Sequence, residues 1–261
     1  MLPFWLSIAA LSLVQAALLA APRDPSHPWL RRLGGSWWAL APPLSIAVVV
    51  GAISLEPGAA RFLTYLALVA VPPLAALALG ALVRGARPRL ALLVVPLFAL
   101  GWIGQGALAG RTAGLALSAL ACLSLGWLLA GAVPSRWLAL GIYAMAAVDV
   151  WLIAGNLLQE PNATLNAAAP AAELPRLQYV SFGSAAMGFG DLFIAALLGA
   201  MLAHDRRLQL RGAVLVAALG LGFDLLFLWA DQLPATVPTA LALAALQLAG
   251  RRSGQSPLRA G

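Results

Sequence analysis

The sequence predicts an all-α polytopic membrane protein with nine transmembrane helices, and three observations carry this prediction. Apolar residues make up 62% of the 261-residue chain and charged residues only 10%, whereas soluble domains carry roughly 25% charged residues. Apolar stretches close to the roughly 20 residues that cross a bilayer recur along the chain. All 16 basic residues are arginines that fall between these stretches. The composition excludes a water-soluble globule, and the net charge of +7 reports on membrane topology rather than on a nucleic-acid partner.

Each apolar run is expected to be a helix, because backbone polar groups in lipid must be satisfied within the segment. The opening run ends in small residues like a secretory signal, but it lacks a positive start and contains Pro3, so we expect a retained span. Only the linker 157–177 is longer than a turn. The nine predicted spans are 3–21, 36–55, 62–83, 90–109, 112–133, 137–158, 178–203, 212–230 and 233–250.

The arginines predict the orientation of these spans. Thirteen of the 16 fall on one side of the nine spans, and Arg61, Arg111 and Arg176 fall on the other. Because positively charged short loops stay in the cytoplasm, we expect an outside N-terminus, an outside linker 157–177 and a cytoplasmic tail 251–261. The use of arginine alone, together with many alanines, favours a prokaryotic source and hence the prokaryotic cell (inner) membrane.

Three acidic residues lie inside apolar runs, where a carboxylate costs at least ~2.5 kcal/mol. Asp149 lies 12 residues after Trp137 in the sixth span, and Asp191 lies 12 residues before Ala203 in the seventh. At ~1.5 Å per residue, both are about 18 Å from the cytoplasmic face, so the two carboxyl groups are predicted to meet. Asp224 is a possible additional acid, but its spacing from Asp231 places it nearer the outer surface and favours a polar contact within the bundle.

Two carboxyl groups facing each other in a low-dielectric site are expected to share one proton. Such a pair activates water in aspartic proteases, and it also suits proton transfer across a membrane, so depth alone leaves both chemistries open. The single Cys122 and the two loop histidines offer no zinc motif, and Ser184 lacks a buried histidine partner. We therefore expect neither a metal nor another cofactor.

The segment around Asp191 carries a family resemblance. Gly188-Phe189-Gly190-Asp191 is similar to the motif of the GxGD intramembrane aspartyl proteases, which include presenilin and signal peptide peptidase. The apolar run that follows, to Leu202, resembles the signal peptide peptidase branch. The resemblance implies a presenilin-like bundle in which Asp149 and Asp191 are catalytic, 1–136 is a scaffold and 137–250 holds the catalytic helices. Val148 departs from the family, which has a tyrosine before the first aspartate.

The resemblance also implies a substrate and its contacts. The substrate would be a transmembrane helix or a signal-peptide remnant, unwound and added as a strand beside the site. Gly188, Phe189 and Gly190 would allow its close approach. A family Pro-Ala-Leu motif opens the last span, and two imperfect alignments of it remain open, starting at Pro234 or at Pro238. Residues implied to contact substrate there are Pro234, Ala235, Pro238, Thr239, Ala240 and Leu241.

Three alternatives stay open. Prepilin peptidases also use Gly-x-Gly-Asp, but they place a basic residue directly after the acid, where this chain has Leu192. A proton-coupled transporter would use Asp149, Asp191 and Asp224 as a relay, although no clear inverted repeat is present. A non-enzymatic membrane scaffold would leave the aligned acids unexplained. An outside linker between the catalytic spans matches signal peptide peptidase and implies substrates with cytoplasmic N-termini.

Overall fold

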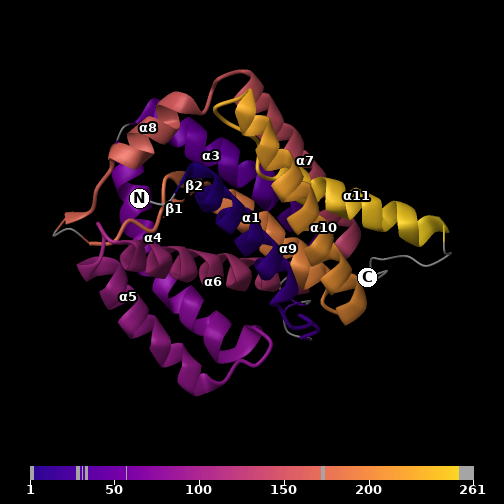
Figure 1. Ribbon diagram of the computed structural model, residues 1–261. Coiled ribbons are helices and arrows are strands. Elements are labelled where there is room, and N and C mark those ends of the chain that lie inside the picture. The colour runs from indigo at the N-terminus through magenta and orange to yellow at the C-terminus, as the bar shows by residue number, and fades with distance from the viewer. Residues whose placement is uncertain are drawn as a thin grey trace.

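The chain is almost entirely helical in its computed structural model (Figure 1). The structure describes residues 3–27, 30, 32, 35–56, 58–171 and 174–252, so Glu173 and the predicted tail from residue 253 onward lie outside the described residues. The α-helices are α1 (Phe4–Ala20), α3 (Ala41–Leu55), α4 (Gly58–Leu77), α5 (Val94–Ile103), α6 (Leu108–Ala132), α7 (Ser135–Ala154), α8 (Gln159–Ala167), α9 (Phe189–Leu202), α10 (Arg206–Asp224) and α11 (Val237–Arg252). Single helical turns of other types extend several of them: η1 (Ser36–Leu40), η2 (Ala78–Leu82), η3 (Pro88–Leu93) and η5 (Leu225–Leu228).

The predicted spans correspond to helices in the structure. Each of the nine predicted ranges overlaps a described helix. Within the described residues, four helices are long and apolar enough to cross a membrane, namely Gly58–Leu82, Leu108–Ala132, Ser135–Ala154 and Arg206–Leu228. Shorter apolar helices are Phe4–Ala20, Trp37–Ile53, Pro88–Ile103 and Phe189–Leu202. A mostly helical chain with several membrane-length helices is therefore confirmed, and nine crossings stay a prediction.

The prediction of a helix throughout 178–203 is wrong in its first part. The structure forms a two-stranded antiparallel hairpin there, with β1 (Val180–Phe182) paired to β2 (Ala185–Met187). Gly183 lies in the hairpin turn with φ of 59°, a left-handed conformation that glycine adopts without steric cost. Helix α9 begins only at Phe189. Short apolar runs are compatible with strand and helix alike, which is why the pattern did not distinguish them.

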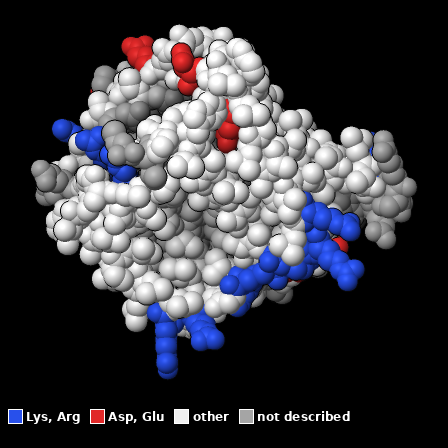
Figure 2. All heavy atoms as spheres, in the orientation of Figure 1, with Lys and Arg blue, Asp and Glu red and all other residues white. Residues whose placement is uncertain are grey.

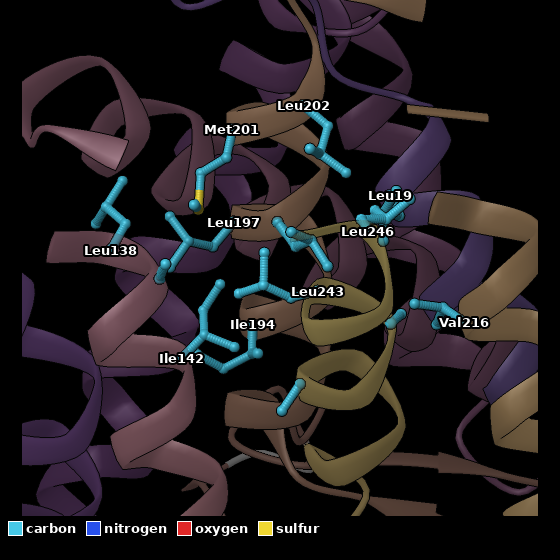
Figure 3. Close-up of a cluster of buried hydrophobic side chains, with 14 of the residues drawn as sticks. Leu19, Leu138, Ile142, Ile194, Leu197, Met201, Leu202, Val216, Leu243 and Leu246 are labelled. Atoms are coloured by element: carbon cyan, nitrogen blue, oxygen red, sulfur yellow. The ribbon is translucent and has the colours of Figure 1, made fainter. Parts of the chain in front are cut away.

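The core lies where α9 is surrounded by other helices. All of the residues from Ile194 to Leu202 are buried, so α9 has no face left for solvent or lipid over these turns. Ile142 of α7, Leu243 of α11 and Val216 of α10 belong to the same cluster (Figure 3). A helix that is apolar all round is expected in such a central position. Helices α1, α6, α10 and α11 therefore pack directly against α9, and α7 contributes side chains such as Ile142 to the same cluster.

Helix α1 also belongs to this core, although the sequence assigns it to the scaffold 1–136. Leu19 of α1 is fully buried in the cluster with α9, α10 and α11 (Figure 3). A Cβ atom at Gly199 of α9 would lie 2.4 Å from the Leu19 carbonyl oxygen. The absence of that side chain is what lets α1 and α9 approach so closely. The first helix is thus packed directly against the predicted catalytic segment.

Candidate active site

Asp149 lies on the buried side of α7. Leu138, Ile142, Met145 and Leu152 are buried on the same helix at spacings of three to seven residues, so Asp149 continues an apolar stripe. Its side chain is 6% exposed. The hydroxyl of Thr236 donates a hydrogen bond of 2.7 Å to Asp149 Oδ2, and this pair is buried. A buried carboxyl group thus has a polar partner that comes from the start of the last helix.

Asp191 lies in the first turn of α9. The backbone N–H of Gly188 donates a 3.0 Å hydrogen bond to Asp191 Oδ2. An acidic side chain in this position satisfies one of the unpaired donors at a helix N-terminus and interacts favourably with the helix dipole. The thiol of Cys122 on α6 contacts the carbonyl oxygen of Phe189 at 3.4 Å. Asp191 is therefore fixed by the start of its own helix, and α6 supports that start.

The two aspartates lie near each other, Asp149 on α7 and Asp191 at the start of α9. Their carboxyl groups are close enough to interact electrostatically. Gly190 contributes to the approach, because a Cβ atom there would lie 3.0 Å from Met145 Cε, one turn before Asp149. The sequence argument assumes unbroken helix between each acid and the end of its span. Helix α7 is continuous from Ser135 to beyond Asp149, and α9 is continuous from before Asp191 to Leu202. The structure thus brings together the two acids that the sequence pairs.

Of the two alignments of the last-span motif, the structure brings the one beginning at Pro234 to Asp149. Thr236, the third residue of that alignment, bonds Asp149, and its backbone N–H is directed at the same carboxyl group. Helix α11 starts one residue later, at Val237. Pro238, Thr239 and Ala240 are buried in the first turn of α11, whereas Leu241 is 50% exposed. Among these residues, it is the Pro234–Thr236 segment that contacts a predicted catalytic acid.

Two residues that the sequence analysis did not select contact this region. Thr236 is one, because it occupies the position where the family motif has leucine. Gln15 of α1 is the other: its side-chain amide donates to the carbonyl oxygens of Asp191 (3.4 Å) and Ala235 (3.2 Å). Gln15 is 1% exposed. A glutamine within an apolar run was the available signal, because a buried amide needs partners.

Asp224 has a different environment from the other two acids. It is the last residue of α10, and the hydroxyl of Ser12 on α1 donates a 2.8 Å hydrogen bond to Asp224 Oδ2. The described contact is therefore a tie between α1 and α10. The hydrogen bond from Ser12 agrees with the polar contact within the bundle that the depth of Asp224 favours. It does not add Asp224 to the Asp149–Asp191 pair.

The hairpin leads directly into the site. Strand β2 ends at Met187, and Gly188 follows it and bonds Asp191. Val180 lies opposite Met187, and Ser181 lies opposite Ala186. Ala186 and Gly188 are exposed, whereas Ala185 and Met187 are buried. An exposed strand next to an acidic side chain is a place where another extended chain can add by backbone hydrogen bonding.

A cavity of about 400 Å³ opens among the loops between α5 and α6 and before β1. Two of the three arginines predicted to lie outside, Arg111 and Arg176, line it together with Tyr179 and Ser181. None of the predicted catalytic or substrate-contacting residues lines this cavity. It is therefore separate from the aspartate pair.

Comparison of the chain with protein-family models, with curated protein sequences and with solved structures gave no match. In the part of the chain that the structure describes, no three His, Cys, Asp or Glu side chains are grouped so that they could hold a metal ion.

Proposed function

We propose that the chain is an intramembrane aspartyl protease of the GxGD type, resembling the signal peptide peptidase branch. One observation carries the proposal. Asp149 and Asp191, from two helices separated by a linker and a hairpin, are close enough to interact electrostatically. Asp149 accepts a hydrogen bond from Thr236 before α11, and Asp191 accepts one from Gly188 at the start of its own helix. A carboxyl pair within apolar helices is costly, so its retention favours a catalytic role.

The pair would hydrolyse a peptide bond with water. One carboxylate draws a proton from a water molecule as the water oxygen attacks the peptide carbonyl carbon. The partner, which holds the shared proton, donates a hydrogen bond to the carbonyl oxygen and then supplies the proton for the departing amine. Thr236 would orient Asp149, and the Gly188 N–H would orient Asp191, so that neither carboxyl group rotates away.

The substrate would be a transmembrane helix or a signal-peptide remnant, because the site lies between apolar helices. Peptide bonds of a helix are shielded by their own hydrogen bonds, so the cleaved segment must first unwind. Strand β2, in which Ala186 is exposed, would pair with the unwound segment and present it to Asp191. Gly188, Phe189 and Gly190 would allow its approach, and the Pro234–Leu241 segment would contact it from the other side.

The complete proposal is a nine-helix, presenilin-like bundle in a prokaryotic cell membrane, with residues 137–250 forming its catalytic part. The N-terminus and the hairpin would lie outside and the arginine-rich loops in the cytoplasm. Support for placing the hairpin and these arginines on opposite sides comes from α1, which begins beside the hairpin through Ser7 and Ser184 and ends beside Arg84 and Arg206. Substrates with cytoplasmic N-termini would then bind with the chain direction that allows cleavage.

Proteolysis by the purified full-length chain in detergent tests this function. Asp149→Asn and Asp191→Asn should each abolish cleavage of a helical membrane substrate while the far-UV circular dichroism stays unchanged. Asp224→Asn is the matched control, because it removes an intramembrane acid outside the pair, and it should retain cleavage. Activity that survives either change in the pair would overturn the proposal.

The same preparation separates the alternatives. Solute uptake by reconstituted vesicles that is lost with an uncoupler, without any cleavage, would favour the proton-coupled transporter. Cleavage of a prepilin leader, but of no membrane helix, would favour the prepilin peptidase chemistry.

A further inference from the structure

Away from the aspartate pair, three arginines are held together where four helical segments end or begin. The chain after α1 and the chain after η2 pair as a short antiparallel bridge at Pro22 and Val83. The Arg23 N–H donates to the Leu82 carbonyl at 2.9 Å, and the Arg84 N–H donates to the Ala21 carbonyl at 3.0 Å. This backbone pairing fixes Arg23 and Arg84 on opposite sides of the bridge, and the side chain of Arg84 reaches Gln209 in the first turn of α10.

A single buried amide then joins two of the guanidinium groups. Gln209 is 0% exposed, and its Oε1 accepts from Arg84 Nη2 at 2.9 Å and from Arg206 Nη1 at 2.8 Å. Its Nε2 donates to the carbonyl oxygens of Pro22 and Gly199, both at 3.0 Å, so the amide cannot turn around. Two positive groups are therefore held on one neutral oxygen.

Backbone carbonyls complete this arrangement. Arg84 Nη2 donates to the Ala203 carbonyl at 3.2 Å, and Arg206 Nη1 donates to the Ala20 carbonyl. These carbonyls lie at the C-terminal ends of α9 and α1, where arginine is favourable but only a partial negative charge is available. Arg84 donates its described side-chain hydrogen bonds from Nη2 alone, and Arg206 from Nη1 alone. An arginine side chain has five N–H donors.

Positive charges dominate the surroundings of Arg84. Partial burial lowers the pKa of Arg84, and the neighbouring Arg206 and Arg23 lower it further, with Asp24 as the opposing charge. The nearby Asp205 uses its carboxylate to cap α10, accepting from the Arg207 and Leu208 N–H groups. Figure 2 shows basic side chains concentrated along one edge of the molecule, over the start of α10. A fixed group of like charges favours binding of an anion.

We propose that Arg23, Arg84 and Arg206 bind the phosphate group of an anionic phospholipid. The position favours a lipid, because the membrane-length helix Gly58–Leu82 ends two residues before Arg84 and the helix Arg206–Leu228 begins at Arg206. The guanidinium groups therefore lie at the level where apolar spans give way to headgroups. A planar guanidinium group can donate two hydrogen bonds to two oxygens of one phosphate group. A diffuse positive surface lacks this geometric match.

Native mass spectrometry and thermal unfolding of the full chain in neutral detergent test this site. Phosphatidylglycerol should bind and raise the unfolding midpoint, and phosphatidylcholine should do so far less. Arg84→Gln with Arg206→Gln should weaken phosphatidylglycerol binding at least about tenfold, because charge-assisted hydrogen bonds are lost. The matched control, Arg207→Gln with Arg211→Gln, removes the same charge from exposed residues of the same helix and should change binding less than about twofold.

A conservative variant keeps the test decisive if the double change impairs folding. Arg84→Lys preserves the charge but loses the planar guanidinium group. A specific site therefore predicts weaker phosphatidylglycerol binding in this variant, whereas a diffuse positive surface predicts unchanged binding. Equal losses in the two double variants, or unchanged binding in Arg84→Lys, would overturn the proposal. Equal stabilisation by inorganic phosphate alone would assign the site to a free anion instead of a lipid. Asp191→Asn should retain the lipid dependence, so this result is independent of proteolysis.

Discussion

The hydroxyl of Thr236 donates a 2.7 Å hydrogen bond to Asp149 Oδ2 across a fully buried contact between α7 and the start of α11. The two residues are 87 positions apart. Because the bond joins the sixth and ninth predicted spans, it links the position of the last helix to the orientation of one catalytic acid. Thr236 is therefore a positioning residue under the proposed function.

Thr236→Val should lower kcat with little effect on KM. Valine has nearly the same shape but cannot donate to Asp149, and a hydrogen bond to an ionised partner contributes about 1.5–3 kcal/mol, or roughly 10- to 100-fold in rate. Thr236→Ser keeps the hydroxyl and should restore most of the rate and the pH profile. The measurement is the pH dependence of kcat and of kcat/KM for a helical substrate.

Thr64→Val provides the control, because the Thr64 hydroxyl is also buried but bonds the Ala60 carbonyl within α4. It should leave the pH profile unchanged. Equal rate losses in Thr236→Val and Thr64→Val would show that the effect is general destabilisation and not positioning of Asp149.

The aspartate pair could be predicted from the sequence, but its hydrogen-bond partners could not. Counting residues along two helices is enough to place Asp149 and Asp191 at a common depth. Thr236 and Gln15 reach the site through contacts between distant segments, and no local pattern encodes such contacts. The hairpin at 180–187 was missed because a short, mostly apolar run is compatible with strand and helix alike. Helix α1 was assigned to a scaffold because its packing against α9 depends on Gly199, whose role is visible only in three dimensions.

Gln15→Leu should reduce both stability and activity. The side-chain amide of Gln15 is the described donor that connects α1 to the carbonyls of Asp191 and Ala235. Leucine fills a similar volume but leaves those two carbonyls without this donor, which costs about 1–3 kcal/mol for each group that stays buried and unpaired. The thermal midpoint and the cleavage rate should both fall.

Gln247→Leu is the comparison for this prediction. Gln247 accepts from the Tyr143 hydroxyl at 2.8 Å and makes no described contact with the aspartate pair. It should lower the midpoint without a selective loss of cleavage at a temperature where the protein is folded. If Gln15→Leu behaves in the same way, then Gln15 supports the fold alone.

Gly188→Ala should impair catalysis more than Gly190→Ala. A Cβ atom at Gly188 would lie 3.0 Å from Asp191 Oδ2, the atom that accepts the Gly188 N–H bond. The φ of −68° and ψ of 149° at Gly188 suit alanine, so the change acts through the carboxyl group and not through backbone strain. A Cβ atom at Gly190 would instead meet Met145 Cε, the end of a flexible side chain.

Combining variants tests this difference between the two glycines. Met145→Leu removes the terminal methyl group at a usual cost below ~1.5 kcal/mol. It should therefore recover activity in Gly190→Ala but not in Gly188→Ala. Recovery of both, or of neither, in a single-turnover cleavage assay would contradict the assigned contacts.

The packing of α6 against α9 makes a prediction that is independent of function. Gly126 of α6 faces α9 so closely that an added Cβ atom would lie 2.7 Å from the Leu197 backbone nitrogen. Backbone atoms cannot move aside as a side-chain end can, so Gly126→Ala must separate the two helices or fail to pack. We expect an unfolding free energy lower by about 1–3 kcal/mol or more, the usual cost of overpacking.

Gly222→Ala on α10 is the matched substitution, because nothing lies within 4 Å of its added Cβ atom. Alanine is favoured over glycine within a helix by roughly 0.5–1 kcal/mol, so this change should stabilise the protein slightly. Equilibrium unfolding in detergent compares the two variants with the parent chain. Opposite signs support the close α6–α9 packing, because helix propensity favours alanine at both positions and the contact with the α9 backbone at Ala196 and Leu197 distinguishes them. A stabilising Gly126→Ala would instead show that α6 and α9 are farther apart than described.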